Sequence, residues 1–233
     1  MTTRTALVTG ASRGLGRALA TALADRGWRL VLDGRDPDRL ASAVAGLPHP
    51  DLVTAVPGDV ADPEHRAALA AAVGPRLDLL VNNASDLGPS PLPMLADLRP
   101  EEFLRVLTVN TVAPLALVQA VLPALRNANG TVVDISSDAA VEPYAGWGGY
   151  GASKAALDQL TAVLAVENPG LRVFAVDPGD MNTDMHQAAF PGEDISDRPA
   201  PETVVPAFLA LLDSTLPSGR YRAADLVPAG TAR

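Results

Sequence analysis

The stretch TALVTGASRGLG, residues 5–16, decides the fold expected for this chain. The run TALV reads as a buried strand, and it leads into a turn with glycines at positions 10, 14 and 16. Apolar residues then recur at helical spacing. Glycine permits a close approach of the backbone to a ligand, and a helix that begins there offers free N–H groups to an anion. This is the context of a dinucleotide-binding turn; a tight connection that binds nothing is the alternative.

Short apolar runs alternate with helical patterns along the rest of the chain. Repeated alternation predicts an α/β fold, a doubly wound parallel sheet of about seven strands with helices on both faces, in one domain over residues 1–233. Residues 184–201 lack periodicity and are rich in Pro, Gly and Asp, which favours a substrate-binding loop over an idle surface excursion. The expected strands are 5–8, 29–32, 52–56, 77–81, 131–135, 172–176 and 219–223; the expected helices after the first are 36–45, 63–73, 101–126, 150–166 and 202–212.

Composition excludes several classes of protein. The 233 residues carry 18 Lys+Arg against 27 Asp+Glu, and a net charge of −9 disfavours nucleic acid and anionic lipid as partners. No cysteine is present, so disulfides and thiolate metal sites are excluded, and three scattered His residues form no metal-site pattern. No apolar run approaches the ~18 residues of a membrane span. We expect a soluble cytoplasmic protein without a metal.

The end of the second predicted strand bears on the choice of dinucleotide. An acid there holds the ribose 2′-OH of NAD, whereas an Arg accommodates the 2′-phosphate of NADP. The strand ends in LDGR, residues 32–35, so Asp33 and Arg35 both lie nearby, and Arg13 lies in the glycine turn. Two guanidinium groups suit a dianionic phosphate, which favours NADP(H). Asp33 lies one position from where the ribose-binding acid is expected. If Asp33 takes that role, the cofactor is NAD(H), which is the alternative.

Two segments carry candidate catalytic groups. Tyr150 and Lys154 are four residues apart and share a helix face, so the ammonium is expected to lower the pKa of the phenol from ~10. Tyr150 is therefore a candidate general acid/base. Ser137 follows the fifth strand, where its hydroxyl can donate to a substrate oxygen. The alternative is a Ser-Ser turn that caps its own backbone, which we assign to Ser136.

Asn110 lies inside a long predicted helix, four residues before Pro114. Because proline has no N–H, the carbonyl of Asn110 loses its helical donor and is free to hold a water or a Lys. A kink that only bends the helix around the core is the alternative.

These residues together resemble the short-chain dehydrogenase/reductase family, in its compact single-domain branch. The resemblance covers roughly residues 4–225. It rests on Thr9-Gly10-x-x-x-Gly14-x-Gly16, Asp59-Val60, Asn82-Asn83-Ala84, Asn110, Ser137, Tyr150-x-x-x-Lys154 and Pro178-Gly179-x-x-x-Thr183. It implies a Rossmann fold, an oxidoreductase that transfers hydride between NADP(H) and a carbonyl or alcohol, and a homotetramer or homodimer.

The resemblance also implies a catalytic tetrad of Asn110, Ser137, Tyr150 and Lys154. Tyr150 would pass the proton, Ser137 would hold the substrate oxygen, and Lys154 would lower the Tyr150 pKa and bind the nicotinamide ribose. Asn110 would hold a water that links Lys154 to solvent. The implied cofactor residues are Gly10, Ser12, Arg13, Gly14, Leu15, Gly16, Arg35, Asp59, Val60, Asn83, Ala84, Tyr150, Lys154, Pro178, Gly179, Met181 and Thr183.

The substrate pocket is expected to be apolar and partly aromatic, which favours a hydrophobic or polycyclic carbonyl. Two departures from the family pattern stand out: Ser85 replaces a glycine, and GRYRA, residues 219–223, replaces an Asp-Gly-Gly turn and bears on the subunit contact. A non-catalytic NADP(H)-binding sensor or scaffold is the alternative function. The expected substrate-binding residues are Ser137, Tyr144, Trp147, Tyr150, Met185, His186 and Phe190.

Overall fold

The strands are short apolar runs, and the central ones are buried almost throughout. Strands with apolar side chains on both faces belong in the middle of a parallel sheet covered by helices. The structure, a computed structural model, describes residues 3–226. Its strands are β1 (Thr5–Val8), β2 (Arg29–Gly34), β3 (Val53–Pro57), β4 (Leu79–Asn82), β5 (Thr131–Ile135), β6 (Arg172–Asp177) and β7 (Gly219–Arg222).

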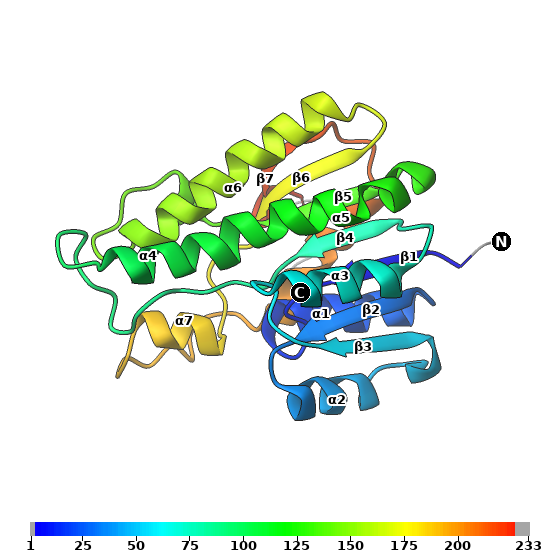
Figure 1. Cartoon of the computed structure of the whole chain (residues 1–233). Helices are drawn as coiled ribbons and strands as arrows, with labels where there is room; N and C mark the ends of the chain where they lie inside the picture. The colour runs from blue at the N-terminus through cyan, green and yellow to red at the C-terminus, as the bar shows by residue number, and fades with distance from the viewer. Residues whose placement is uncertain (1–2, 227–233) are drawn as a thin grey trace.

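The seven strands form one parallel sheet in the order β3-β2-β1-β4-β5-β6-β7. The order reverses between β1 and β4, so the chain winds outward in both directions from the middle of the sheet (Figure 1). Ligands of open α/β sheets bind at such a switch point, beyond the carboxyl ends of the strands. The doubly wound seven-stranded sheet predicted from the sequence is confirmed.

Helices cover both faces of the sheet. One core packs α1 and α8 against one face, and a second core packs α3, α5 and the end of α6 against the other (Figure 1). The helices are α1 (Gly14–Asp25), α2 (Pro37–Ala45), α3 (Pro63–Val73), α4 (Pro100–Leu107), α5 (Ala113–Ala128), α6 (Gly148–Glu167), α7 (Asp184–Ala189), α8 (Val205–Asp213) and α9 (Ala223–Leu226).

The long helix predicted over 101–126 is interrupted. A π-helical turn at Thr108–Val112 joins α4 to α5, and the Ala113 N–H donates to the Thr108 carbonyl across this wider turn. Pro114 lies just beyond it and cannot donate to the carbonyl four residues back, so a wider turn accommodates the missing hydrogen bond. The proline therefore widens the helix at Asn110.

The same helical stretch, taken across the π-helical turn, corrects one expectation. Pro100–Ala128 contains an 18-residue window with a mean hydropathy of 1.7, which is long and apolar enough to cross a membrane by length and composition. Half of that window is buried inside the protein. Helices that cover a sheet in α/β proteins are often this apolar, because one face of each helix packs against the sheet. Scanning for unbroken apolar runs missed the segment because polar residues are spread along it.

The segment 184–201, expected as a loop, begins with α7. Thr183 caps this helix, because its hydroxyl accepts a hydrogen bond from the His186 N–H at 3.2 Å. The helix is only six residues long, too short for its periodicity to stand out in the sequence. It lies beside the carboxyl edge of the sheet (Figure 1).

Candidate active site

The carboxyl ends of the strands open into one continuous cleft of about 1310 Å³. Residues of all three expected groups, those for the cofactor, for catalysis and for the substrate, lie along this cleft. Every predicted site residue lines the cleft except Gly16 and Asn110. Gly16 instead packs against the glycine turn, where a Cβ would lie 2.5 Å from the Gly10 carbonyl oxygen. Asn110 is buried behind the cleft wall.

The glycine turn is braced from beneath. Gly10 has φ +64, and a Cβ there would lie 2.9 Å from the Ala84 Cα, so only glycine fits. The Asn83 side chain does not point into the cleft as a free ligand, because its amide donates to the carbonyls of Thr9 (2.8 Å) and Gly10 (3.2 Å). Asn83 thus fixes the shape of the turn.

Asp33 is also used as a brace. Its carboxylate accepts a hydrogen bond from the Gly10 N–H at 2.5 Å and lies 3.1 Å from His65 Nε2, and the residue is 1% exposed. Burial raises the pKa of this carboxyl, and the contacts with His65 and Gly10 lower it. A carboxylate engaged in this way is not available to a ribose hydroxyl, so the geometry does not support the NAD(H) alternative that rests on Asp33.

The start of α1 suits an anionic group. Arg13 is the N-cap residue, yet its side chain makes no capping hydrogen bond, so the first-turn N–H groups depend on another acceptor. Ser12, Gly14 and Leu15 line the cleft at this point. A pyrophosphate fits a helix N-terminus of this kind.

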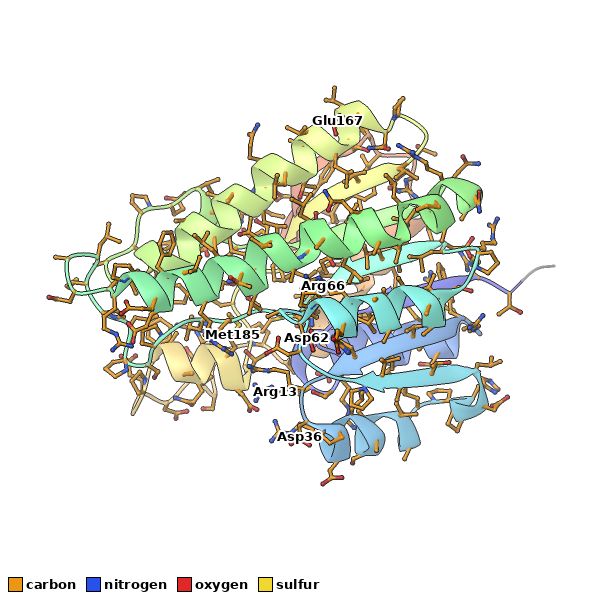
Figure 2. All side chains as sticks on the ribbon, in the orientation of Figure 1. Arg13, Asp36, Asp62, Arg66, Glu167 and Met185 are labelled. Carbon is orange, nitrogen blue, oxygen red and sulfur yellow. The ribbon has the colours of Figure 1, made fainter. Side chains whose placement is uncertain are left out.

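Four arginines line the same end of the cleft: Arg13, Arg17, Arg35 and Arg39. Arg13 and Arg35, expected at a 2′-phosphate, both line it, and Arg39 of α2, which the sequence analysis did not single out, joins them. Figure 2 shows Arg13 at the edge of the sheet next to α7. Arg13 and Arg39 (3.3 Å) both pair with Asp184, and the hydrogen bond from Arg13 lowers the pKa of that carboxyl.

Tyr150 lies at the centre of the cleft, between two serines. Its hydroxyl makes hydrogen bonds with Ser85 and Ser137 that lower its pKa, but burial raises the pKa by more. The expected lowering of the Tyr150 pKa is therefore wrong for the structure, because desolvation of the phenolate outweighs the hydrogen bonds. The phenol is protonated at neutral pH and is able to donate a proton.

Lys154 is held away from the phenol hydroxyl. Its ammonium donates to the Ile135 carbonyl at 2.7 Å and lies 5.6 Å from the centre of the Tyr150 ring. It is 2% exposed and is the only lysine of the chain. Burial lowers the pKa of Lys154 to about 8, although the negative charges of Asp134 and Asp158 oppose this. The side chain is thus mostly charged at pH 7.

Ser137 combines two of the roles weighed from the sequence. Its hydroxyl donates to Asp138 Oδ1 (3.0 Å) and accepts from the Ala139 N–H (3.2 Å), in addition to its contact with Tyr150. The capping role that we assigned to Ser136 belongs to Ser137. The buried Ser136 hydroxyl has no hydrogen-bond partner within the described part of the chain.

Asn110 reaches the reactive centre through Ser85. Its side-chain oxygen accepts from the Ser85 hydroxyl (3.1 Å) and the Asp86 N–H (2.7 Å), and its amide nitrogen donates to Ser153 (2.9 Å). Ser85 in turn contacts Tyr150. The serine that departs from the family pattern is therefore a site residue. A single hydroxyl in place of a glycine forms no sequence pattern, so this role could not be predicted from the sequence.

The far end of the cleft is aromatic. Trp147 packs edge-on against Tyr150, with ring centres 5.6 Å apart, and contacts Phe190 at 6.1 Å. His186 lies 5.0 Å from the Phe190 ring, and its buried Nε2 has no hydrogen-bond partner among the described residues. Tyr144 is half exposed and donates to Asp138 Oδ2 at 3.0 Å. The apolar, partly aromatic lining expected here is present.

Comparisons with known proteins identify the family. A family model for short chain dehydrogenases matches residues 4–194. The chain belongs to the short-chain dehydrogenase family. It is 36% identical over 199 residues to sepiapterin reductase from Bos taurus, covering 78% of this chain and 74% of that reductase. It is 34% identical over 221 residues to the uncharacterized oxidoreductase YciK from Escherichia coli (strain K12), covering 90% and 86%.

A solved structure shows the same architecture. A short-chain dehydrogenase from Shigella flexneri, complexed with NADP, superposes with a TM-score of 0.86 at 32% sequence identity. The match covers 95% of this chain and 97% of the other. As a member of the short-chain dehydrogenase family, the present chain is an oxidoreductase of the nicotinamide-dependent type.

The single lysine allows a direct measurement of the site. In protein labelled with 15N at lysine, the one side-chain amine signal should titrate near pH 8 rather than near ~10.5, because burial disfavours the ammonium. The folded state then binds fewer protons than the unfolded state between pH 8 and ~10, so Lys154 should add to the free energy of unfolding as the pH rises through this window. A midpoint above pH 10 in the folded protein would contradict the geometry.

Proposed function

We propose that this chain is an NADP(H)-dependent carbonyl reductase in which Tyr150 donates the proton. The observation that carries the proposal is the position of the Tyr150 hydroxyl between Ser85 and Ser137, in the cleft that also holds the free N-terminus of α1. The Lys154 ammonium lies 5.6 Å from the centre of the same ring. The reaction reduces a ketone or aldehyde to an alcohol: the carbonyl carbon gains a hydride and the oxygen gains a proton.

The chemistry divides between cofactor and protein. NADPH, when bound, supplies the hydride. Ser137 donates a hydrogen bond to the substrate oxygen as negative charge develops there, and Tyr150 transfers its proton to the same oxygen. The raised pKa of Tyr150 suits this direction, because the phenol is in its acid form at neutral pH.

Lys154 acts on the product of that proton transfer. Loss of the proton leaves a phenolate in a buried site, which is costly without a nearby cation. The Lys154 ammonium, 5.6 Å from the ring, offsets this charge and remains mostly protonated at pH 7. The water relay through the Asn110 carbonyl stays a prediction.

Preference for NADP(H) follows from charge. Arg13, Arg35 and Arg39 surround the end of the cleft where a 2′-phosphate would lie, and guanidinium groups bind such a dianion with forked hydrogen bonds. Asp33 is engaged with Gly10 and His65 and does not compete. The NADP complex of the Shigella flexneri relative supports the same choice.

The aromatic end of the cleft favours a flat, apolar carbonyl compound. Trp147 and Phe190 offer ring faces on one side of Tyr150, and the unpartnered His186 Nε2 offers one hydrogen bond to a polar group of the substrate. Segment 184–201 contributes two of these side chains, so we keep it as the proposed substrate-binding segment. Sepiapterin, the compound in the name of the bovine relative, is a suitable first member of a screen of ketones and aldehydes.

We further propose a homodimer or homotetramer. Leu104, Val112 and Leu115 are exposed on the helix that runs from α4 into α5, and Val163 and Val166 are exposed on α6. These helices lie side by side on one face (Figure 1). Exposed apolar side chains on adjacent helices are typical of a self-complementary interface. A cytoplasmic location, with neither nucleic acid nor membrane as partner, stays part of this proposal on the strength of the acidic net charge.

Replacing Tyr150 with Phe tests the proton donor. With a substrate found by following loss of NADPH absorbance, Tyr150→Phe should lower kcat/KM by roughly 100-fold or more, because general acid catalysis contributes that much. NADPH affinity, measured by fluorescence, should change little. Tyr221→Phe is the matched control, since the Tyr221 hydroxyl donates to the Pro217 carbonyl away from the cleft. Normal turnover by Tyr150→Phe would reject the role, and an inactive wild type that binds NADPH would favour the sensor.

Removing Arg13 and Arg35 together tests the choice of cofactor. The double Ala variant should weaken NADPH binding by roughly tenfold or more per arginine, since each charge-assisted hydrogen bond is worth ~1.5–3 kcal/mol. NADH binding should stay within about threefold, because NADH lacks the 2′-phosphate. Arg76→Ala, which removes an arginine paired with Asp78 outside the cleft, is the control. Equal losses for both cofactors would show that these arginines do not read the phosphate.

A charge placed on the exposed apolar face tests the oligomer. Leu115→Glu should shift the mass measured by light scattering from a dimer or tetramer toward the monomer, because a carboxylate is costly in an apolar interface. Val141→Glu introduces the same kind of change at a valine that is 62% exposed in another part of the surface, and should leave the mass unchanged. A wild-type chain that is monomeric at micromolar concentration would refute the interface.

A further inference from the structure

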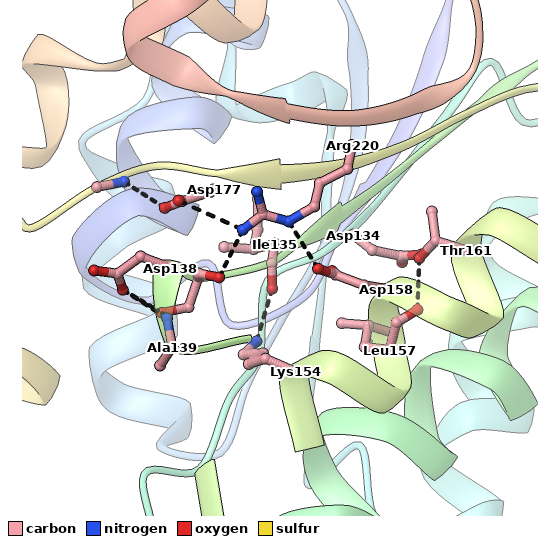
Figure 3. Close-up of polar contacts among 12 residues, drawn as sticks. Asp134, Ile135, Asp138, Ala139, Lys154, Leu157, Asp158, Thr161, Asp177 and Arg220 are labelled. Atoms are coloured by element: carbon pink, nitrogen blue, oxygen red, sulfur yellow. Dashed lines mark hydrogen bonds and ion pairs between the residues drawn. The ribbon is translucent and has the colours of Figure 1, made fainter. Parts of the chain in front are cut away.

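A guanidinium on the last strand of the sheet connects three segments of the site (Figure 3). Arg220 lies on β7, opposite Ala175 of β6. Its Nε donates to Asp158 Oδ2 at 2.9 Å, and its Nη2 donates to the Ser137 carbonyl at 2.9 Å. The same Nη2 lies 3.6 Å from Asp177 Oδ2. Arg220 does not itself line the cleft.

Each partner of Arg220 adjoins a different part of the reactive centre. Ser137 carries the hydroxyl that contacts Tyr150. Asp158 lies on α6, one helical turn beyond Lys154. Asp177 ends β6 and accepts from the Gly179 N–H at 3.0 Å. One planar group therefore spans the ends of β5 and β6 and the helix that carries the lysine.

Because the side chains of this cluster are largely buried, their ion pairs contribute more to the site than exposed ion pairs would. The side chains of Asp158 and Asp177 are 14% and 8% exposed, and that of Arg220 is 28% exposed. Asp158 Oδ1 has no hydrogen-bond partner in the range 3–226. Removing the cation would take away the guanidinium bonded to Asp158 and leave these two nearly buried carboxylates only the charges of Lys154 and Arg222 to offset them, which is unfavourable. An exposed pair such as Arg222 with Asp225, 3.9 Å apart, carries no such weight.

The two carboxylates also act on the catalytic groups by charge. Asp158 raises the pKa of Lys154, and Asp177 raises the pKa of Tyr150. Arg220 in turn lowers the pKa of Asp177, which burial raises. The guanidinium therefore offsets negative charge that would otherwise bear fully on Lys154 and Tyr150.

We propose that Arg220 is a positioning residue for the reduction, which holds the Ser137 backbone in place and balances the charges of Asp158 and Asp177 beside the lysine and tyrosine. The inference rests on the proposed function for its kinetic consequence. The two roles separate chemically. Balancing charge needs only a cation, whereas bonding Ser137 and Asp158 at once needs the fork of a guanidinium.

Three variants test these roles. In Arg220→Met, the titration midpoint of the Lys154 amine should move upward by roughly half a pH unit or more, because loss of a nearby cation favours the ammonium. The kcat should fall roughly tenfold, because Ser137 is no longer held in place. NADPH affinity should stay within about twofold, since the arginines at the 2′-phosphate are unchanged. The control Arg76→Met, which removes an arginine paired with Asp78 outside the cleft, should alter none of these quantities.

Arg220→Lys separates charge from geometry. It should keep the Lys154 midpoint near its wild-type value but still lower kcat, because an ammonium cannot bond both partners as the fork does. It also serves if Arg220→Met fails to fold, since it retains the charge. A wild-type kcat in Arg220→Lys would then overturn the positioning role.

The outcomes distinguish this inference from the proposed function. If a folded Arg220→Met shows an unmoved Lys154 midpoint and wild-type kcat, the role of Arg220 is wrong while the reductase assignment stands. Lower thermal stability with the same midpoint and kcat would mean a structural contact only, and would equally overturn it. If the wild type reduces no carbonyl with NADPH, the proposed function fails, and the Lys154 midpoint still decides whether Arg220 balances the site.

Discussion

The site depends on keeping a lysine charged inside the protein. Lys154 is almost completely buried, and burial disfavours its ammonium form. The fold compensates with the Ile135 carbonyl at 2.7 Å and with the charges of Asp134 and Asp158. Asp134 is itself buried and is held by Thr161 at 2.6 Å, beside which it lies in Figure 3, and by Asn82 at 2.7 Å. The ends of β4 and β5 and helix α6 are thereby tied to one another around a single ammonium.

A second constraint, at the other end of the cleft, has the same character. Asp33 is placed where a cofactor-reading acid would stand in the sequence, yet its carboxylate turns inward to the Gly10 N–H and His65. The glycine turn, the end of β2 and the start of α3 are joined by this one side chain. Both ends of the cleft therefore use a buried charge to shape the backbone.

Much of the fold could be predicted because it rests on repeating patterns. Buried strands alternate with helices, and glycines at 10, 14 and 16 mark the turn, so the doubly wound sheet follows from periodicity alone. Short or irregular elements escaped, such as the six-residue α7 and the π-helical turn at Thr108–Val112, because neither has a period of its own. The prediction that the Tyr150 pKa is lowered failed for another reason: sequence spacing reports a neighbouring charge but not the depth of burial.

The site residues likewise fall into those that a sequence pattern predicts and those that it does not. Motif residues such as Tyr150 and Lys154 could be located from spacing, whereas Ser85, Arg39 and Arg220 reach the site from unrelated parts of the chain. Their positions depend on which strands are neighbours and on which way the side chains turn. A single sequence contains no local signal for either.

The lone lysine has a practical consequence. Amine-directed labelling reagents find a single side-chain target in this chain, and this lysine is 2% exposed and lies 5.6 Å from the centre of the Tyr150 ring. The rate at which Lys154 is modified therefore reports how often the wall of the cleft opens, in the way that amide exchange reports local unfolding. Lys154 can therefore serve as a built-in probe of local opening at the proposed active site.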